Sequence, residues 1–445
     1  MKAASLKYGV LMAMVWLISV IMVLVPFHAF LTVWLSTFIG HYTALRLWKE
    51  VLLAICGLGA LYLLATDHKI RTHTLSRRLV WLIWGYVLVQ LACGLVAYKR
   101  QAVDAKALAY GLLINLRFLA FFLVTWAVAL RTSRLNKLWP RLLLWPAAVV
   151  VIFGVIQEFF LTPRFLEHFG YSKYTILPFQ YVDNNHAFLR VQSTLRGANP
   201  LGAYLVVIVS VLLVYLLSAK DSRRFKQGAA FLAITLTTLF FTYSRSAWIG
   251  TALAATGIGL IALKKKNTKI LIVGLAAGLI VLGGGVLVGL RHNSLVENTL
   301  FHTTAKSHSK VTSNGSHLFL VRNGVEDILK NPLGKGPGTA GPASVYNNHP
   351  PRIAENYFVQ IGQETGWLGL ALFLLINAGV GYILWLRRSE PLALALFASL
   401  IGLTVVNLLL HAWADDTLAY IWWGLAGIAI GMAMTGPLET KNREG

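Results

Sequence analysis

Three arginines occupy positions where the sequence changes from polar to apolar. Arg196 lies in STLRGANPLGAYL, Arg245 in the short turn of FTYSRSAWIG, and Arg322 in the amphipathic stretch LFLVRNGVEDILK. A guanidinium at an apolar boundary is costly unless it is paired or reaches water, so such a residue is either an anchor or a functional group. Because the planar guanidinium binds phosphate through bidentate, charge-assisted hydrogen bonds, the functional reading predicts an anionic substrate.

A carboxylate group follows in the segment RIAENYFVQIGQETGWLGL. Glu355 and Asn356 stand at the start of a predicted helix, and Gly366 and Gly369 lie one turn apart inside it. Small residues at this spacing allow close helix packing. Glu355 either stabilises the helix dipole or acts as a general base that accepts the proton of an acceptor hydroxyl.

Other polar residues are secondary candidates. His349 in YNNHPPR is a possible base, and Asp415 and Asp416 in HAWADD are candidates for binding an acceptor or a cation, although a helix N-cap would explain one of them. The histidine spacing fits no metal motif, and Cys56 and Cys93 both lie in apolar runs. With no P-loop or GxGxxG segment either, the sequence predicts no metal and no cofactor.

The elements that must position these residues are membrane helices. The chain of 445 residues is 57% hydrophobic and 13% charged, with a mean hydropathy of +0.64. This leaves too little polar surface for a soluble protein, whereas each long apolar run could cross about 30 Å of hydrocarbon as a helix. The segment 28–42 is short and is predicted to lie at the interface or to re-enter the membrane. We predict an all-α polytopic membrane protein with about twelve transmembrane helices, near residues 8–25, 45–66, 79–97, 108–130, 140–161, 199–218, 227–243, 246–263, 270–290, 357–385, 391–411 and 418–436.

The distribution of the positive charge, which is +23 in total, indicates the membrane topology. Lys and Arg gather in short loops between apolar runs, which favours a cytoplasmic position for these loops and for both termini, and argues against a nucleic-acid partner. Residues 1–445 are then one integral membrane domain, with extracytoplasmic loops at 162–198 and 291–356, the larger of which carries short helices. This topology predicts that the three arginines and Glu355 lie on the extracytoplasmic side. Since nucleotide donors are cytoplasmic, a lipid-linked diphosphate donor fits that side.

With these residues in place, the chain resembles the O-antigen ligase and polymerase superfamily. The resemblance rests on Arg196 with Asn199 and Pro200, on the SRxxW turn that contains Arg245, on the Arg322 helix that ends in NPLGKGPG, and on the ENx9GxxG segment. It implies a bacterial inner-membrane enzyme that performs a metal-independent, inverting, GT-C-like transfer of a glycan from undecaprenyl diphosphate. It also implies arginines that hold the diphosphate and a base at the start of the last motif.

Ligases of this superfamily carry a histidine at the position of Glu355. Either Glu355 takes over as the base, with His349 as a weaker substitute, or the chain belongs to a polymerase-like branch. In the resulting hypothesis Arg196, Arg245 and Arg322 neutralise the leaving diphosphate while Glu355 deprotonates the acceptor hydroxyl. The acceptor would be lipid A core in lipopolysaccharide biosynthesis, another glycan, or a protein, as in protein O-oligosaccharyltransferases.

A membrane transporter for a small anion such as bicarbonate is the alternative function. A carrier is expected to contain ionisable residues or Gly/Pro breaks in matching halves near the membrane midplane. The predicted spans contain few acids, among them Glu158 and Glu364.

Overall fold

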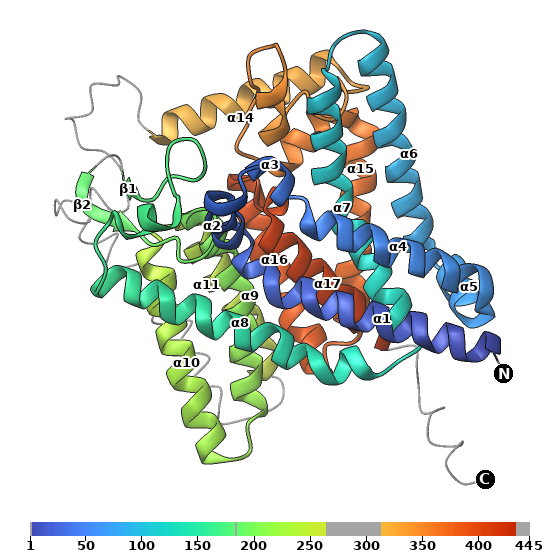
Figure 1. Cartoon of the computed structure of the whole chain (residues 1–445), viewed down its shortest axis with the longest axis vertical. Coiled ribbons are helices and arrows are strands. Elements are labelled where there is room, and N and C mark those ends of the chain that lie inside the picture. The colour runs from blue at the N-terminus through green and yellow to red at the C-terminus, as the bar shows by residue number, and fades with distance from the viewer. Residues whose placement is uncertain (1, 183–184, 264–312, 433–445) are drawn as a thin grey trace.

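The computed structural model describes residues 2–182, 185–263 and 313–432, which form a bundle of α-helices with one small sheet (Figure 1). The first elements are α1 (Lys2–Leu24), η1 (Val25–Phe27), α2 (His28–Ile39), α3 (Tyr42–Leu45), α4 (Trp48–Thr66), α5 (His68–Leu75), α6 (Arg78–Lys99), α7 (Ala105–Ala129) and α8 (Arg134–Phe159). Next come η2 (Phe165–Phe169), β1 (Gln180–Val182), β2 (Asn185–Arg190), α9 (Ala198–Ser218), α10 (Ser222–Phe241) and α11 (Arg245–Leu263). The last are α14 (Ser313–Lys330), η4 (Gly341–Tyr346), α15 (Tyr357–Leu386), α16 (Pro391–Leu409), η5 (Ala412–Ala414) and α17 (Asp416–Met432).

The helices confirm the prediction of an all-α polytopic membrane protein. Among the described residues, eight helices are long and apolar enough to cross a membrane. Helices α10, α11 and α17 stand at further predicted spans, whereas the predicted helix at 270–290 lies outside the described residues, so the total of about twelve stays a prediction. The antiparallel pair β1 and β2, which lies inside the segment 162–198, was not predicted.

The segment 28–42 is helical and follows α1 almost directly. Helix α2 is joined to α1 through η1, and the apolar run Ser5–Ile39 is continuous. Its Val33 is fully buried in a small cluster with Leu166 and Tyr171, and Phe30 contacts Phe169 at a ring distance of 5.1 Å. Helix α2 therefore packs against the segment 162–198, at the same end of the bundle.

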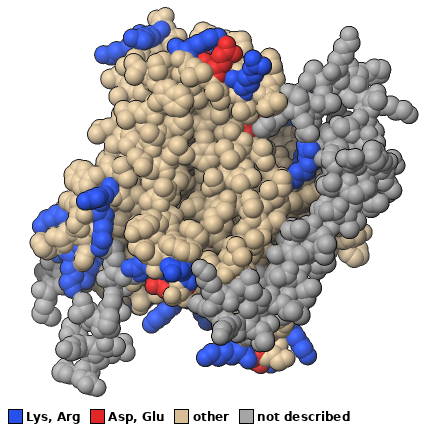
Figure 2. Space-filling view, turned by 180° about the vertical axis from the view of Figure 1, so that it is seen from behind, with Lys and Arg blue, Asp and Glu red and all other residues tan. Residues whose placement is uncertain are grey.

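The segments predicted to be extracytoplasmic meet at one end of the bundle. Hydrogen bonds join them: Thr194 Oγ1 to Pro26 O (2.9 Å), Val191 N to Phe241 O (2.9 Å) and Asp104 N to Asn347 Oδ1 (2.8 Å). Among the loops predicted to be cytoplasmic, Arg131 Nε forms an ion pair with Asp67 Oδ2 at 2.9 Å. Figure 2 shows a broad uncharged face with Lys, Arg, Asp and Glu mostly at its margins, as expected for a surface that contacts lipid.

Helices α9 and α17 form the centre of the bundle and are buried along nearly their whole length (Figure 1). A helix that is apolar on all sides is stable only where other helices cover it. Beside α9, helices α11 and α16 approach closely, because a Cβ atom on Gly402 would lie 2.2 Å from Gly250 O. The core thus positions α16 and α17. Asp415 lies at the end of the connection between them, and Asp416 is the first residue of α17.

Helix α15 is interrupted at Gly366, where φ is +64°. A Cβ atom here would lie 2.1 Å from Pro332 O, so the glycine admits the loop that follows α14. Backbone carbonyl groups near the break accept hydrogen bonds from this loop. For example, Glu364 O accepts from Gly336 N at 2.8 Å. The predicted close approach at this glycine is present, but a loop rather than a helix makes it.

Candidate functional site

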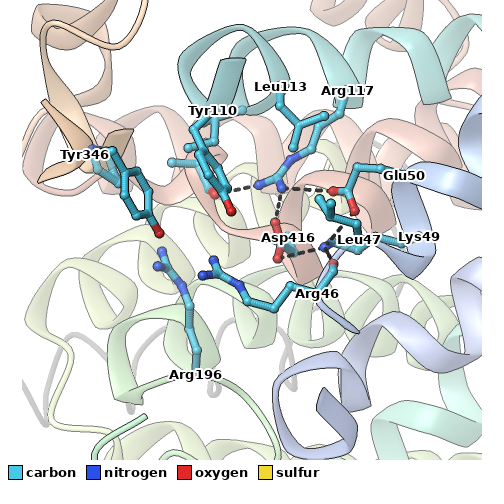
Figure 3. Close-up of a pocket in the computed structure, with 13 residues that line it drawn as sticks. Arg46, Leu47, Lys49, Glu50, Tyr110, Leu113, Arg117, Arg196, Tyr346 and Asp416 are labelled. Atoms are coloured by element: carbon cyan, nitrogen blue, oxygen red, sulfur yellow. Dashed lines mark hydrogen bonds and ion pairs between the residues drawn. The ribbon is translucent and has the colours of Figure 1, made fainter. Parts of the chain in front are cut away.

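A cavity of 190 Å³ opens where α4, α7, η4 and α17 meet (Figure 3). Arg46 lines it from the turn between α3 and α4, and Lys49 from the start of α4. Arg117 lines it from the middle of α7, and Arg196 from the segment before α9. The full lining is Arg46, Leu47, Lys49, Glu50, Tyr110, Leu113, Ile114, Arg117, Arg196, Pro342, Tyr346, Ala414 and Asp416. We call this space the first cavity.

Its inner wall is a buried ionic network. Arg117 forms ion pairs with Asp416 and with Glu50 Oε1 (3.3 Å), and its NH2 donates to Ala414 O at 2.8 Å. Lys49 Nζ lies 3.0 Å from Glu50 Oε2 and 3.3 Å from Asp416 Oδ2. Two cations thus face two carboxylates. Because removing one partner of a buried pair typically costs about 3–5 kcal/mol, this network fixes the position of Arg117 firmly.

His28 completes the network from the start of α2. Trp48 Nε1 donates to His28 Nδ1 at 2.9 Å, and His28 Nε2 lies 3.1 Å from Asp416 Oδ2. A nitrogen that accepts a hydrogen bond carries no proton, so the neutral ring donates from Nε2 to the carboxylate. Asp416 is therefore held by three side chains and belongs to the wall of the cavity.

Arg46 and Arg196 converge at the mouth of the first cavity. In Figure 3 their guanidinium groups lie near each other and point toward the hydroxyl of Tyr346. Arg196 Nε donates to Asp415 Oδ2 at 2.8 Å, and Asp415 Oδ1 accepts from Leu418 N at 3.2 Å. Asp415 is thus the N-cap of α17 and also orients Arg196. Two cations that converge repel each other, and an anion between them relieves the repulsion.

Tyr346 is positioned by stacking and by the loop before it. Its ring stacks on Tyr110 with centroids 4.5 Å apart, and Lys106 Nζ lies 4.7 Å from its centre. Upstream, Gly338 has a φ of +84°, and its N–H donates to the buried carboxylate of Glu364 at 2.8 Å. The motif NPLGKGPG therefore fixes η4, which carries Tyr346.

A second cavity of 260 Å³ adjoins the first. Arg196 and Pro342 line both spaces. The other lining residues are Gln180, Gly197, Asn199, Pro200, Ala203, Leu410, His411, Ala412 and Asp415. Arg190 connects this wall to the predicted SRxxW turn, because its NH2 donates to Asn199 Oδ1 (2.6 Å) and its Nε to Thr242 O (3.0 Å).

Glu355 is exposed and is in the lining of neither cavity. It has a φ of +50°, a conformation that costs a residue other than glycine about 1–3 kcal/mol. The helix cap is its neighbour Asn356, whose Oδ1 accepts from Val359 N at 3.0 Å. Asn356 Nδ2 donates to Leu408 O at 2.9 Å, two residues before Leu410 of the cavity wall. Capping of α15 is therefore assigned to Asn356.

The remaining predicted residues are absent from the linings of these two cavities. Arg245 is half-buried at the start of α11, Arg322 is exposed on α14, and His349 is exposed after η4. Of the three predicted arginines, Arg196 lines the first cavity. The roles of Arg245, Arg322 and His349 stay predictions.

The sequence analysis missed Arg46, Lys49, Glu50, Arg117 and Tyr346. Arg117 had a clear signal, since an ionisable residue inside an apolar run is a functional candidate by default. Arg46 and Tyr346 had none, because their relevance depends on contacts between segments far apart in the sequence. In the described part of the chain, no group of three or more His, Cys, Asp or Glu side chains is arranged to hold a metal ion.

Comparison with known families adds an independent result. The family model described as O-antigen ligase matches residues 229–374, from α10 into α15. This region contains Arg245, Arg322 and Glu355, and the segment that carries Tyr346. No curated protein matches the chain. Residues 229–374 are therefore similar to the O-antigen ligase family, in agreement with the resemblance to the O-antigen ligase-like superfamily.

Proposed function

We propose that this protein is a glycosyltransferase that moves a glycan from a polyprenyl diphosphate carrier, such as undecaprenyl diphosphate, to an acceptor hydroxyl. The observation that carries the proposal is the convergence of Arg46 and Arg196 with the Tyr346 hydroxyl in one cavity. Two guanidinium groups and a hydroxyl suit the oxygens of a diphosphate. The similarity of residues 229–374 to the O-antigen ligase family supports the same substrate class.

In the proposed reaction the first cavity receives the diphosphate. Arg46 and Arg196 stabilise the negative charge that grows on the leaving group, and the ionic network of Arg117 behind them holds the cavity wall in place. A preorganised donor of this kind is typically worth about 2.7–4 kcal/mol of transition-state stabilisation. Arginines supply this charge in place of a divalent cation, so the proposed transfer is metal-independent.

The proposed chemical step is a single in-line displacement. The acceptor oxygen attacks the anomeric carbon, the bond from that carbon to the diphosphate oxygen breaks, and the diphosphate leaves with the electron pair. In this proposal the acceptor proton passes to the exposed carboxylate of Glu355. One displacement inverts the anomeric configuration. Lipid A core, another glycan and a protein hydroxyl are the acceptor classes of this proposal.

A transfer assay tests the function. The full chain in proteoliposomes is expected to release undecaprenyl diphosphate from an undecaprenyl diphosphate glycan only when an acceptor of one of these classes is added. An Arg196→Ala protein serves as the inactive control. Uptake of bicarbonate into the vesicles, without release of the carrier by any acceptor class, would instead support a transporter.

The proposal also places the cavities on the extracytoplasmic side of the bacterial inner membrane. In a protein with Cys56 and Cys93 replaced by alanine, a cysteine at exposed Lys173 is expected to react with a membrane-impermeant thiol reagent in intact spheroplasts. A cysteine at exposed Arg223, in the first turn of α10, is expected to react only after lysis. The reverse labelling pattern would place the site in the cytoplasm and end the argument for a lipid-linked donor.

A further inference from the structure

We propose that the second cavity binds the first sugar of the donor glycan, as a neutral pyranose. This rests on the proposed function, because it requires the diphosphate to lie between Arg46 and Arg196. The first sugar is bonded directly to the diphosphate and must occupy the adjoining space. Arg196 and Pro342 line both cavities, so the second cavity is the space that adjoins the diphosphate site.

The two cavities differ in charge in the way such a donor requires. Four cations and two carboxylates line the first cavity, whereas the polar lining of the second consists of the shared Arg196, its partner Asp415, two amides and one imidazole. Asp415 is 3% exposed, and both of its oxygens are engaged, by Arg196 and by Leu418 N. Side-chain amides both donate and accept hydrogen bonds, which suits sugar hydroxyl and acetamido groups.

Asn199 is oriented for this task by Arg190. The guanidinium donates to Asn199 Oδ1 at 2.6 Å, which directs the amide so that Nδ2 is the group left to donate. Arg190 is itself fixed by its hydrogen bond to Thr242 O. The side chain that contacts the sugar is therefore held on two sides, as a specificity determinant requires.

Gly197 and Gln180 set the size of the space. A Cβ atom on Gly197 would lie 3.5 Å from Gln180 Nε2 and 3.7 Å from Pro200 Cδ, both atoms of lining residues. The Gly197 φ of 169° is extended backbone that any residue adopts. A larger residue therefore causes no backbone strain here, but its side chain would occupy the cavity. The glycine thus leaves room for a ligand beside the Gln180 amide.

The test compares binding of four probes to the purified full chain: inorganic pyrophosphate, undecaprenyl diphosphate, undecaprenyl diphosphate N-acetylglucosamine and undecaprenyl diphosphate galactose. The wild type is expected to bind at least one sugar-bearing carrier about tenfold more tightly than the bare carrier, through added hydrogen bonds. Gly197→Val and Asn199→Ala are expected to remove this increment and to leave binding of pyrophosphate and of the bare carrier unchanged. Gly197→Ala, a smaller change, is expected to reduce it.

Matched controls are Gly57→Val, whose Cβ would meet no atom within 4 Å, and Asn323→Ala on the exposed face of α14. The sugar site would be overturned if the wild type bound neither sugar-bearing carrier more tightly than the bare carrier. It would also be overturned if Gly197→Val and Asn199→Ala both kept the tighter binding. Failure of the proposed function gives a different pattern, in which neither pyrophosphate nor the bare carrier binds, or both bind Arg46→Ala as tightly as wild type.

Discussion

Replacing Arg46 or Arg196 by lysine is expected to slow glycan transfer about 10²–10³-fold while the protein remains folded in the membrane. Lysine keeps the charge but loses the planar fork that binds two phosphate oxygens at once. Arg196 also loses its Nε contact with Asp415, which is the N-cap of α17. The rate of undecaprenyl diphosphate release, normalised to the amount of protein in the membrane, measures the effect.

Arg164 provides the matched control for this prediction. It lies in the same segment as Arg196 and is exposed. Its Nε forms an ion pair with Glu167 Oε2 at 3.0 Å, and neither residue lines a cavity. Arg164→Lys is expected to leave transfer unchanged. Near-normal transfer in both Arg46→Lys and Arg196→Lys would reduce these residues to anchors and remove the first cavity from the reaction.

The double variant adds a sharper criterion. If both arginines bind the same diphosphate, the losses in Arg46→Lys and Arg196→Lys are expected not to multiply, because residues that share a ligand are energetically coupled. Strictly multiplicative losses would indicate two separate sites. Arg245→Lys and Arg322→Lys test whether the site extends to α11 and α14. A loss of transfer as large as in Arg46→Lys would indicate that these predicted residues take part in the reaction.

The arrangement of the membrane helices was largely predictable from the sequence. Long apolar runs and short basic loops carry that information locally, which is why most predicted spans match helices and why loops predicted on one side meet at one end. Topology predicted that Arg196 and the HAWADD segment lie on the same side of the membrane, but not that they meet. The exact partner of Arg196, Asp415, depended on the contact between α9 and α17.

The basic centre of the site was less predictable. Lys49, Arg117 and Asp416 come from α4, α7 and α17, and the network exists only because these helices pack together. No local pattern specifies such long-range pairing. Similarly, the glycines of ENx9GxxG predicted a close approach of another segment to this helix. The sequence did not show that the loop containing Pro332 makes this approach and thereby positions Tyr346.

Replacing Glu355 by glutamine is expected to lower turnover about 10²–10⁴-fold with little change in donor binding. Glutamine keeps the size and polarity of the side chain but accepts no proton. Glu355→His is expected to retain measurable activity, because a neutral imidazole accepts the same proton near neutral pH. Turnover and donor affinity are measured separately, so that loss of chemistry is distinguished from loss of binding.

The backbone of Glu355 supplies the decisive control. At a φ of +50° glycine is less strained than glutamate, so Glu355→Gly is expected to preserve or raise thermal stability while it abolishes transfer. A helix-dipole role predicts the opposite: glutamine and glycine would each lower stability by about 0.3–1 kcal/mol and leave turnover nearly intact. Because Asn356 already caps α15, little of that stabilisation remains for Glu355 to provide. Full turnover in purified Glu355→Gln would exclude this carboxylate as the base and direct the search to His411, which lines the second cavity, and to His349.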